Sequence, residues 1–248
     1  MLHGSQRDLF NLEFRLPSAC ADDLASGAAD IGIVPSFELT RQNLEIIAGV
    51  GIGCHGAVRS ILLISHCQAA EIRSFAADTS SRTSVELARV ILERRYGACP
   101  QSIPHAPDLE AMMGIADAAL IIGDPALRID PAALPYHVYD LGAVWLELTG
   151  LPMVFAVWAG RKGTVTPEIA EAFRASYRYG RERIEEIVAA ESVARGFAPE
   201  VIREYLTRYI VHELGPREYE GMRLFLEWAR ESRRSDVVAA PQCQSAPK

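Results

Sequence analysis

The chain has 248 residues, of which 49% are hydrophobic and 23% are charged, and its formal net charge at pH 7 is −7. This length allows one large domain or two small ones, and the composition is that of an ordinary globular protein. The negative charge argues against nucleic-acid binding, which needs a basic face, but it permits a small anionic ligand held by a few local donors.

Cysteine usage and the apolar runs indicate the compartment. The five cysteines are odd in number and show no Cys-x-x-Cys spacing. They therefore suggest neither a disulfide framework nor a zinc site, and a reducing cytoplasm is expected. No signal peptide opens the sequence, and the apolar run at 151–159 is shorter than the roughly 20 residues that span a bilayer. We expect a soluble, cytoplasmic protein.

Residues 1–159 alternate helices with apolar runs. Ser18 predicts the N-cap and Gly27 the C-cap of a first helix. Apolar runs that are typical of buried strands follow at 29–35, 58–65, 118–122 and 153–158. A further helix, which ends at Gly97, is expected at 84–96, between the second and third of these runs. This alternation predicts an α/β fold with parallel sheets.

Helices alone are expected after residue 163. Thr166 and Pro167 predict an N-cap and a first helical residue, opening a helix that runs to about residue 190. Two more helices are expected near Pro199 and Pro216, the latter ending at 227–230, and all three are expected to cover the first lobe. The polar tail 233–248 is expected to be disordered.

The segments 58–65 and 153–159 bracket one αβ block, which suggests paired crossovers between two lobes. We expect lobe I at 1–66 and 160–232 and lobe II at 67–159, with a ligand cleft between them. In α/β sheets, ligands bind beyond the carboxyl ends of the strands. Three loops meet that condition: Pro35 to Phe37, Asp78 to Thr83, and Gly123-Asp124.

Hydroxyl groups and one guanidinium crowd the start of the helix at 84–96, in the run Asp78-Thr-Ser-Ser-Arg-Thr-Ser84. A helix N-terminus favours an anion because its first N–H groups lack partners and the helix dipole is positive there. Thr83 and Glu86 fit a capping box, which would account for Thr83 and Ser84 but not for the other members of the run. Arg82 is the predicted partner of a substrate carboxylate, since its planar fork can bind one bidentately.

A glycine-punctuated loop is expected from Gly51 to Ser60, before a strand. It matches neither a P-loop nor a dinucleotide fingerprint, and a simple turn is the plainer interpretation. His55 is its candidate for proton transfer, although a loop histidine is more often solvated. Cys54 could be a reactive thiol, but no base stands beside it in the sequence, which favours a small buried residue. Arg59 is expected to point to solvent.

Two further features follow strands. Asp124 stands where a strand passes into a loop, either as a proton-transfer group or as a cap of the turn at Pro125. The run 139–152 predicts a helix that ends at Gly150 and buries Trp145 in the core, next to the second crossover.

Five segments together resemble the menaquinone-pathway chorismate dehydratase family (MqnA type). They are Ala29-Asp-Ile-Gly-Ile-Val-Pro-Ser36, Gly53-Cys-His-Gly-Ala-Val-Arg-Ser60, Asp78 to Ser84, Leu120-Ile-Ile-Gly-Asp124 and Tyr139 to Trp158. The resemblance covers most of residues 17–230. The sister enzyme, a dihydroxynaphthoate synthase, is similar in fold but carries a different loop in place of 78–84.

The resemblance implies a two-lobed fold like that of type II periplasmic binding proteins, and the dehydration of chorismate to 3-[(1-carboxyvinyl)oxy]benzoate without a metal or cofactor. The substrate's own enolpyruvyl carboxylate is one candidate for the proton acceptor. The expected substrate-binding residues are Ser36, Gly53, Cys54, Gly56, Ser60, Thr79, Ser80, Ser81, Arg82, Thr83, Gly123 and Asp124, with His55 and Asp124 as candidate catalytic groups.

Family members begin with a further strand and a loop that supplies an asparagine, before the segment that matches 1–4. This chain starts after that loop, so an unpaired sheet edge is expected. The alternatives are a non-catalytic small-anion binding protein of the same fold and an inactive, truncated homologue. The sequence leaves open a monomer or a homodimer.

Overall fold

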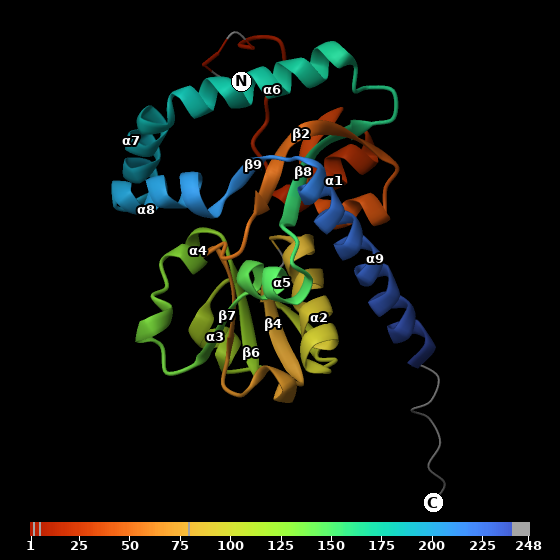
Figure 1. Ribbon diagram of the computed structural model, residues 1–248, viewed down its shortest axis with the longest axis vertical. Coiled ribbons are helices and arrows are strands. Elements are labelled where there is room, and N and C mark those ends of the chain that lie inside the picture. The colour runs from red at the N-terminus through yellow and green to blue at the C-terminus, as the bar shows by residue number, and fades with distance from the viewer. Residues whose placement is uncertain (2, 5, 79, 240–248) are drawn as a thin grey trace, which may run out of the picture.

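The computed structural model describes residues 1–239 except 2, 5 and 79, and its strands form two sheets. The first sheet has the order β1-β8-β2-β9, and the second has the order β5-β4-β6-β3-β7. Each sheet with its helices makes a lobe, and Figure 1 shows the first lobe above the second. This α/β, two-lobed arrangement is the fold class expected from the sequence.

The first lobe is built on an antiparallel sheet. Its strands are β1 (Ile31–Pro35), β2 (Leu44–Cys54), β8 (Met153–Arg161) and β9 (Val211–Glu213). The second sheet is mixed: β4 (Ser74–Asp78) runs parallel to β5 (Gln101–His105) and β6 (Ala118–Ile122), whereas β3 (Ile61–Ser65) is antiparallel to β6 and β7 (His137–Asp140). The expectation of parallel sheets was therefore wrong outside the β5-β4-β6 group.

Two crossovers connect the lobes. The chain leaves the first sheet after Cys54 and enters β3 at Ile61, and it returns between Thr149 and Met153. The boundaries expected at 66 and 159 would therefore separate β3 and β8 from the sheets with which they pair. Trp145, on α5 (Leu141–Thr149), is fully buried as expected and donates from Nε1 to the Pro152 carbonyl at 3.2 Å.

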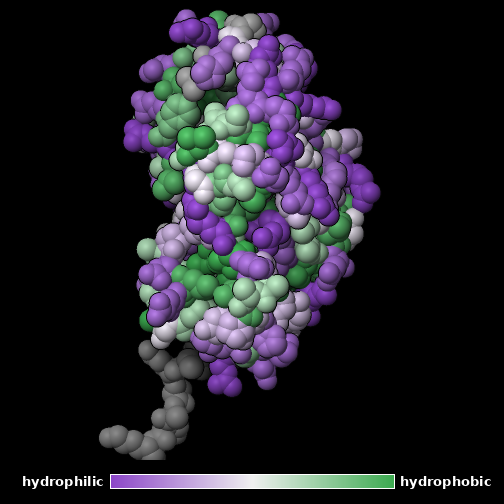
Figure 2. All heavy atoms as spheres, turned by 90° about the vertical axis from the view of Figure 1, so that its left-hand side faces the viewer, coloured by the Kyte–Doolittle hydropathy of each residue, from purple (hydrophilic) through white to green (hydrophobic). Residues whose placement is uncertain are grey.

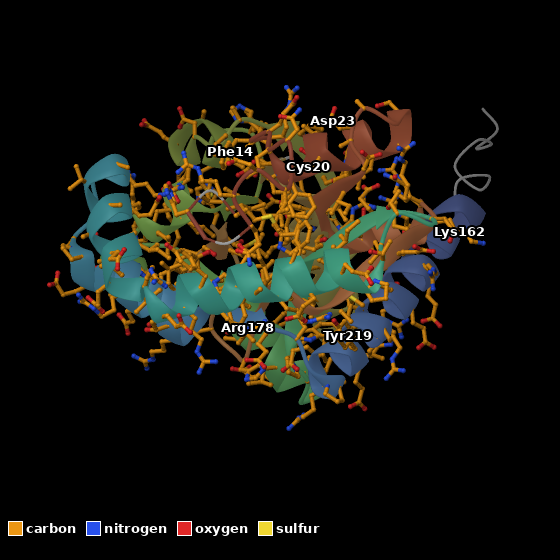
Figure 3. All side chains as sticks on the ribbon, turned by 90° about the horizontal axis from the view of Figure 1, so that it is seen from above. Phe14, Cys20, Asp23, Lys162, Arg178 and Tyr219 are labelled. Carbon is orange, nitrogen blue, oxygen red and sulfur yellow. The ribbon has the colours of Figure 1, made fainter. Side chains whose placement is uncertain are left out.

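The helices of the first 150 residues pack on these sheets. The first is α1 (Pro17–Ser26), which begins one residue before Ser18, so Ser18 is not the N-cap, and which ends at Gly27 as predicted. Besides α5, the others are η1 (Ser36–Thr40), η2 (Ala69–Glu71), α2 (Arg82–Tyr96), α3 (Leu109–Met113), α4 (Asp124–Leu127) and η3 (Pro131–Ala133). Viewed from above, Phe14 and Cys20, at the start of this region, lie on the side opposite Arg178 and Tyr219 (Figure 3).

The C-terminal region differs from the expectation of three helices over one lobe. The predicted helix from Pro167 breaks at Arg183 into α6 (Pro167–Glu182) and α7 (Ile184–Arg195), and α8 (Pro199–Glu204) continues into the π-helical η4 (Tyr205–Tyr209). Helix α9 (Pro216–Ala239) contacts β8 and also α2, so it packs on both lobes. Residues 233–239 are thus helical rather than disordered, and the rest of the expected tail, 240–248, lies outside the described residues.

On the side that carries α4, α7 and α8, hydrophilic and hydrophobic side chains are interspersed in the upper half, and a group of hydrophobic ones lies just below the middle (Figure 2). No helix within the described part of the chain is long and apolar enough to cross a membrane.

Candidate functional site

A hollow of about 810 Å³ opens where the carboxyl ends of β4, β5 and β6 meet. Parallel neighbours place these ends at one edge of the sheet, which is where α/β folds bind ligands. The first lobe contributes Leu16 and Ser18 from the start of α1, so the hollow lies between the lobes. The second lobe contributes Asp78, Ser80, Pro104, His105, Ala106, Pro107, Ile122, Gly123, Asp124 and Pro125.

Asp78 and His105 stand opposite each other at the ends of β4 and β5. Asp78 is 3% exposed, and its Oδ1 accepts a hydrogen bond from the Ser80 amide at 2.9 Å, which turns the chain toward α2. The His105 Nδ1 lies 2.7 Å from the Ala106 carbonyl oxygen. Because a carbonyl only accepts, Nδ1 is the donor in this contact.

Helix α2 begins beside this edge of the sheet. Its N-cap is Ser81, whose Oγ accepts from the Ser84 amide at 3.4 Å, so the predicted capping box at Thr83 and Glu86 is wrong. The cap is shifted because Thr83 is used elsewhere: its Oγ1 accepts from the Phe37 amide at 3.1 Å. Ser80 lines the hollow, and Thr79 lies outside the described residues.

Arg82 binds carboxylates of the first lobe. Its Nη2 donates to Asp22 Oδ1 at 2.9 Å and Oδ2 at 3.0 Å, and its Nη1 donates to Glu38 Oε1 at 3.0 Å. Burial alone would lower the pKa of Arg82, but the hydrogen bonds to Asp22 and Glu38 outweigh it and raise that pKa above the ordinary value. Arg82 lines a second hollow, of about 450 Å³, instead of the first. Its guanidinium is therefore occupied by protein carboxylates and joins the lobes.

Ser36 of the first lobe and Thr83 of the second lobe face each other near Arg82, at a seam where the two lobes are in contact. Both are fully buried, and their hydroxyl oxygens are 3.4 Å apart. Ser36 Oγ also donates to the Val154 carbonyl at 2.7 Å. These two residues, like Arg82, hold the lobes together and do not line the larger hollow.

The segment expected as a loop from Gly51 to Ser60 begins inside a strand, because Gly51 to Cys54 form the end of β2. Glycine is required there: a Cβ at Gly53 would lie 2.7 Å from the Met153 carbonyl oxygen, too close for any side chain. Cys54 is fully buried, and burial, reinforced by the negative charge of Asp140, raises the pKa of its thiol to about 12. The structure thus supports the buried interpretation of Cys54.

Gly56 and Ser60 belong to the first crossover, with Gly56 at a positive φ of 108°. Ser60 is 4% exposed, and its carbonyl accepts from the Gly123 amide at 2.8 Å. This bond attaches the crossover to the Gly123-Asp124 rim of the hollow.

The two candidates for proton transfer differ in position. His55 lies outside the lining of the hollow; its side chain is 57% exposed and contacts Glu218 through Nε2. Asp124 lines the hollow, and its Oδ2 accepts from Arg195 Nη1 at 3.0 Å. Arg59 is partly buried and, unlike the solvent-facing residue expected, donates from Nη2 to the Ile129 carbonyl at 3.4 Å.

The hollow therefore brings together Ser80, Gly123 and Asp124 from the predicted set and adds Asp78 and His105. Asp78 belongs to the motif at 78–84, and its place at a strand end could have singled it out. His105 is the last residue of β5, a strand that the sequence did not reveal. Within the described residues, no group of three or more His, Cys, Asp or Glu side chains is placed to hold a metal ion.

Comparison with known proteins gives concordant results. The sequence model of the family described as menaquinone biosynthesis matches residues 2–231. A chorismate dehydratase of Thermus thermophilus is 29% identical over 243 residues, covering 91% of this chain and 89% of the relative. A chorismate dehydratase of Campylobacter jejuni is 26% identical over 226 residues, covering 88% and 83%.

Solved structures share the fold. A protein of Archaeoglobus fulgidus superposes with a TM-score of 0.62 at 16% identity, covering 91% of this chain and 85% of the other. The periplasmic aliphatic sulphonate binding protein SsuA of Escherichia coli superposes with a TM-score of 0.59 at 18% identity, covering 91% and 77%. At these identities the likeness concerns the two-lobed architecture alone.

Proposed function

Because the chain belongs to the menaquinone biosynthesis family, we propose that it is a chorismate dehydratase, a lyase that converts chorismate into 3-[(1-carboxyvinyl)oxy]benzoate and water. The observation that carries the proposal is the similarity to the Thermus thermophilus dehydratase along 91% of this chain. The hollow between the lobes offers room for a small, doubly charged acid.

The geometry suits the chemistry of this reaction. Loss of the ring hydroxyl and of the neighbouring proton makes the ring aromatic, so the step is downhill and the protein mainly has to position the substrate and assist one proton transfer. No cofactor is needed for that role. Of the two candidates for proton transfer, Asp124 lines the hollow.

We assign the substrate carboxylates to the end of β4 and the start of α2. Ser80 and Ser81 offer hydroxyl groups there, and the first amides of a helix attract an anion. Arg82 and Thr83 hold α2 against the first lobe and thereby fix the direction of that helix end. The cysteines within the described part of the chain are free thiols, which suits the cytoplasm as the proposed location.

The test is an incubation of the full chain with chorismate, followed by absorbance and mass spectrometry. We expect loss of chorismate together with an aromatic product that has lost one water. Ser80→Ala should raise KM, whereas Ser26→Ala, an exposed serine at the far end of α1, should leave it unchanged. Tight binding of chorismate without turnover would refute the dehydratase and favour a small-anion binding protein.

A further inference from the structure

A π-helical turn precedes β9 and begins at Tyr205, whose side chain reaches the first crossover between the lobes. In η4 the Ile210 amide donates to the Tyr205 carbonyl at 3.0 Å, a bond that spans five residues instead of four. A π turn holds one extra residue, which rotates the following side chains by about 100° relative to an α-helix. Such turns occur frequently at functional sites.

Tyr205 makes one specific polar contact. Its hydroxyl donates to Ser60 Oγ at 3.0 Å, and its ring packs against the main hydrophobic core. Burial raises the pKa of Tyr205, although the bond to Ser60 opposes that effect. The phenol therefore stays protonated at neutral pH and acts as a donor.

Ser60 connects Tyr205 to the wall of the hollow. Its side chain is almost inaccessible, and its carbonyl receives the Gly123 amide at 2.8 Å. Gly123 and Asp124 form one wall of the hollow. Tyr205, Ser60 and Gly123 are thus connected by hydrogen bonds from η4 to the rim.

We propose that Tyr205 is a positioning residue, which holds Ser60 and, through Ser60, the Gly123-Asp124 rim in the arrangement that the substrate requires. This proposal rests on the proposed function for its kinetic consequences. A misplaced rim weakens alignment of the reacting groups, and small displacements have large effects on rate. A tyrosine that only filled the core would act through its ring, which phenylalanine supplies equally well.

The same turn provides a matched control. Tyr209 also lies on η4, but its hydroxyl contacts Glu204 Oε1 at 3.3 Å on the exposed surface. Tyr205→Phe and Tyr209→Phe each remove one hydroxyl from the same segment. Tyr205→Phe should lower kcat for chorismate about tenfold, the effect of one lost hydrogen bond to a buried group, with a smaller change in KM. Tyr209→Phe should change neither.

A double-mutant cycle with Ser60→Ala separates positioning from a general structural role. If Tyr205 acts through Ser60, then Tyr205→Phe should cause no further loss of kcat once Ser60 is alanine. Equal losses in both backgrounds, or an unchanged kcat in Tyr205→Phe alone, would overturn the inference. Thermal unfolding of the same four proteins should show non-additive shifts in Tm, and additive shifts would also overturn it.

The two readouts distinguish the possible failures. If the unaltered chain does not turn over chorismate, the proposed function fails. The coupling between Tyr205 and Ser60 is then still tested by the Tm cycle, which needs no substrate.

Discussion

Glu38 is 1% exposed, and three side chains satisfy its carboxylate. Arg82 Nη1 donates at 3.0 Å, Gln42 Nε2 at 3.1 Å and Arg41 Nη1 at 3.2 Å. Burying a charge is costly unless it is paired, so these donors are what permits a carboxylate at this seam. Among these three donors, Arg82 alone comes from the second lobe. Its ion pair with Glu38 therefore joins the two lobes.

Arg82→Ala should lower the free energy of unfolding by about 1.5–3 kcal/mol, the range for hydrogen bonds to buried charged groups. Arg41→Ala is the matched control, because it removes another donor to Glu38 from a side chain that is 51% exposed, and it should cost less than about 1 kcal/mol. Urea unfolding measures both. Equal losses in the two variants would show that the interlobe position of Arg82 adds nothing.

Cys54 should be chemically inert in the folded protein. With a thiol pKa of about 12, only about one molecule in 10⁴ carries the thiolate at pH 8, and the thiolate is the reactive species. Iodoacetamide should therefore modify the exposed Cys99 and spare Cys54 until the chain is unfolded. Modification of Cys54 in the native state, detected by mass spectrometry of its peptide, would contradict the burial of this thiol.

The raised pKa of Cys54 also has a consequence for stability. The folded state favours the protonated thiol, whereas the unfolded thiol ionises near its ordinary pKa of 9.0. Stability from this group is thus fully present below about pH 9 and is lost as the pH rises toward 12. Cys54→Ala should remove the part of the decline in the free energy of unfolding between pH 9 and 12 that this thiol causes.

Helix α5 begins at a carboxylate that serves two segments at once. Asp140 accepts from the Gly142 and Ala143 amides at 3.0 and 3.1 Å, which caps the helix. It also accepts from the Val58 amide at 3.0 Å and the Arg59 amide at 2.7 Å in the first crossover. The crossover, which holds Arg59 at a positive φ of 64°, is thereby tied to the helix that leads to the second crossover.

Asp140→Ala should lower the free energy of unfolding by about 2 kcal/mol or more, the upper end of the range for an N-cap, because the amides of the crossover lose their acceptor as well. Asp130→Ala provides the comparison: Asp130 caps only η3, through the Ala132 amide at 3.0 Å, and should cost less than about 1 kcal/mol. Denaturant unfolding measures both variants. Similar costs would mean that the crossover amides find other partners without Asp140.

Strands with a continuous apolar run were predictable, whereas strands without one were not. The apolar runs of β1, β6 and β8 were recognised directly, as were the Asp140-to-Gly150 helix and its buried Trp145. Strand β5 was missed because it is an edge strand without a fully buried residue and contains Pro104, so it lacks an apolar run. His105 was missed with it, since the last residue of an unrecognised strand cannot be assigned to the rim of a sheet.

Strand β2 was missed for a different reason. Its glycines look like a loop in the sequence, but Gly51 is required because a Cβ there would lie 2.7 Å from the Ala156 carbonyl oxygen in the neighbouring β8. Long-range partners also decided the roles of Arg82 and Thr83. The motif revealed polar side chains at the start of a helix, yet its sequence could not reveal that Arg82 would donate to Asp22 and Glu38 or that Thr83 would accept from the Phe37 amide.

At the scale of the whole molecule, side chains join the lobes at two seams besides α9, which packs on both lobes. One joins α2 to η1 through Thr83 and Arg82, and the other joins α4 to α7 through Asp124 and Arg195. The second consists of exposed contacts, which contribute little: this ion pair, and Arg128, which donates to the Arg195 carbonyl at 2.6 Å and lies over the Phe197 ring. The first is buried at Thr83 and Glu38. Lobe opening that admits a substrate should therefore break the α4–α7 seam more readily than the α2–η1 seam.

Amide exchange at Phe37 can report on the stronger seam. Its N–H donates to Thr83 Oγ1 of the other lobe, so it exchanges with solvent only when the lobes part or the chain unfolds. Thr83→Val removes this acceptor and keeps the shape of the side chain. Exchange of the 36–40 segment should become roughly tenfold faster, the effect of losing one hydrogen bond, while the central strand β6 should be unaffected.

Added chorismate should slow exchange at 36–40 in the unaltered chain, because a ligand held between the lobes favours the arrangement in which they touch. The measurement is hydrogen–deuterium exchange with and without chorismate, and β6 again provides the internal reference. Slowing at both segments by the same factor would indicate global stabilisation instead of closure. Slowing at 36–40 alone would indicate that substrate binding favours the closed arrangement in which the Phe37 amide is bonded to Thr83. The slowing should then be weaker in Thr83→Val.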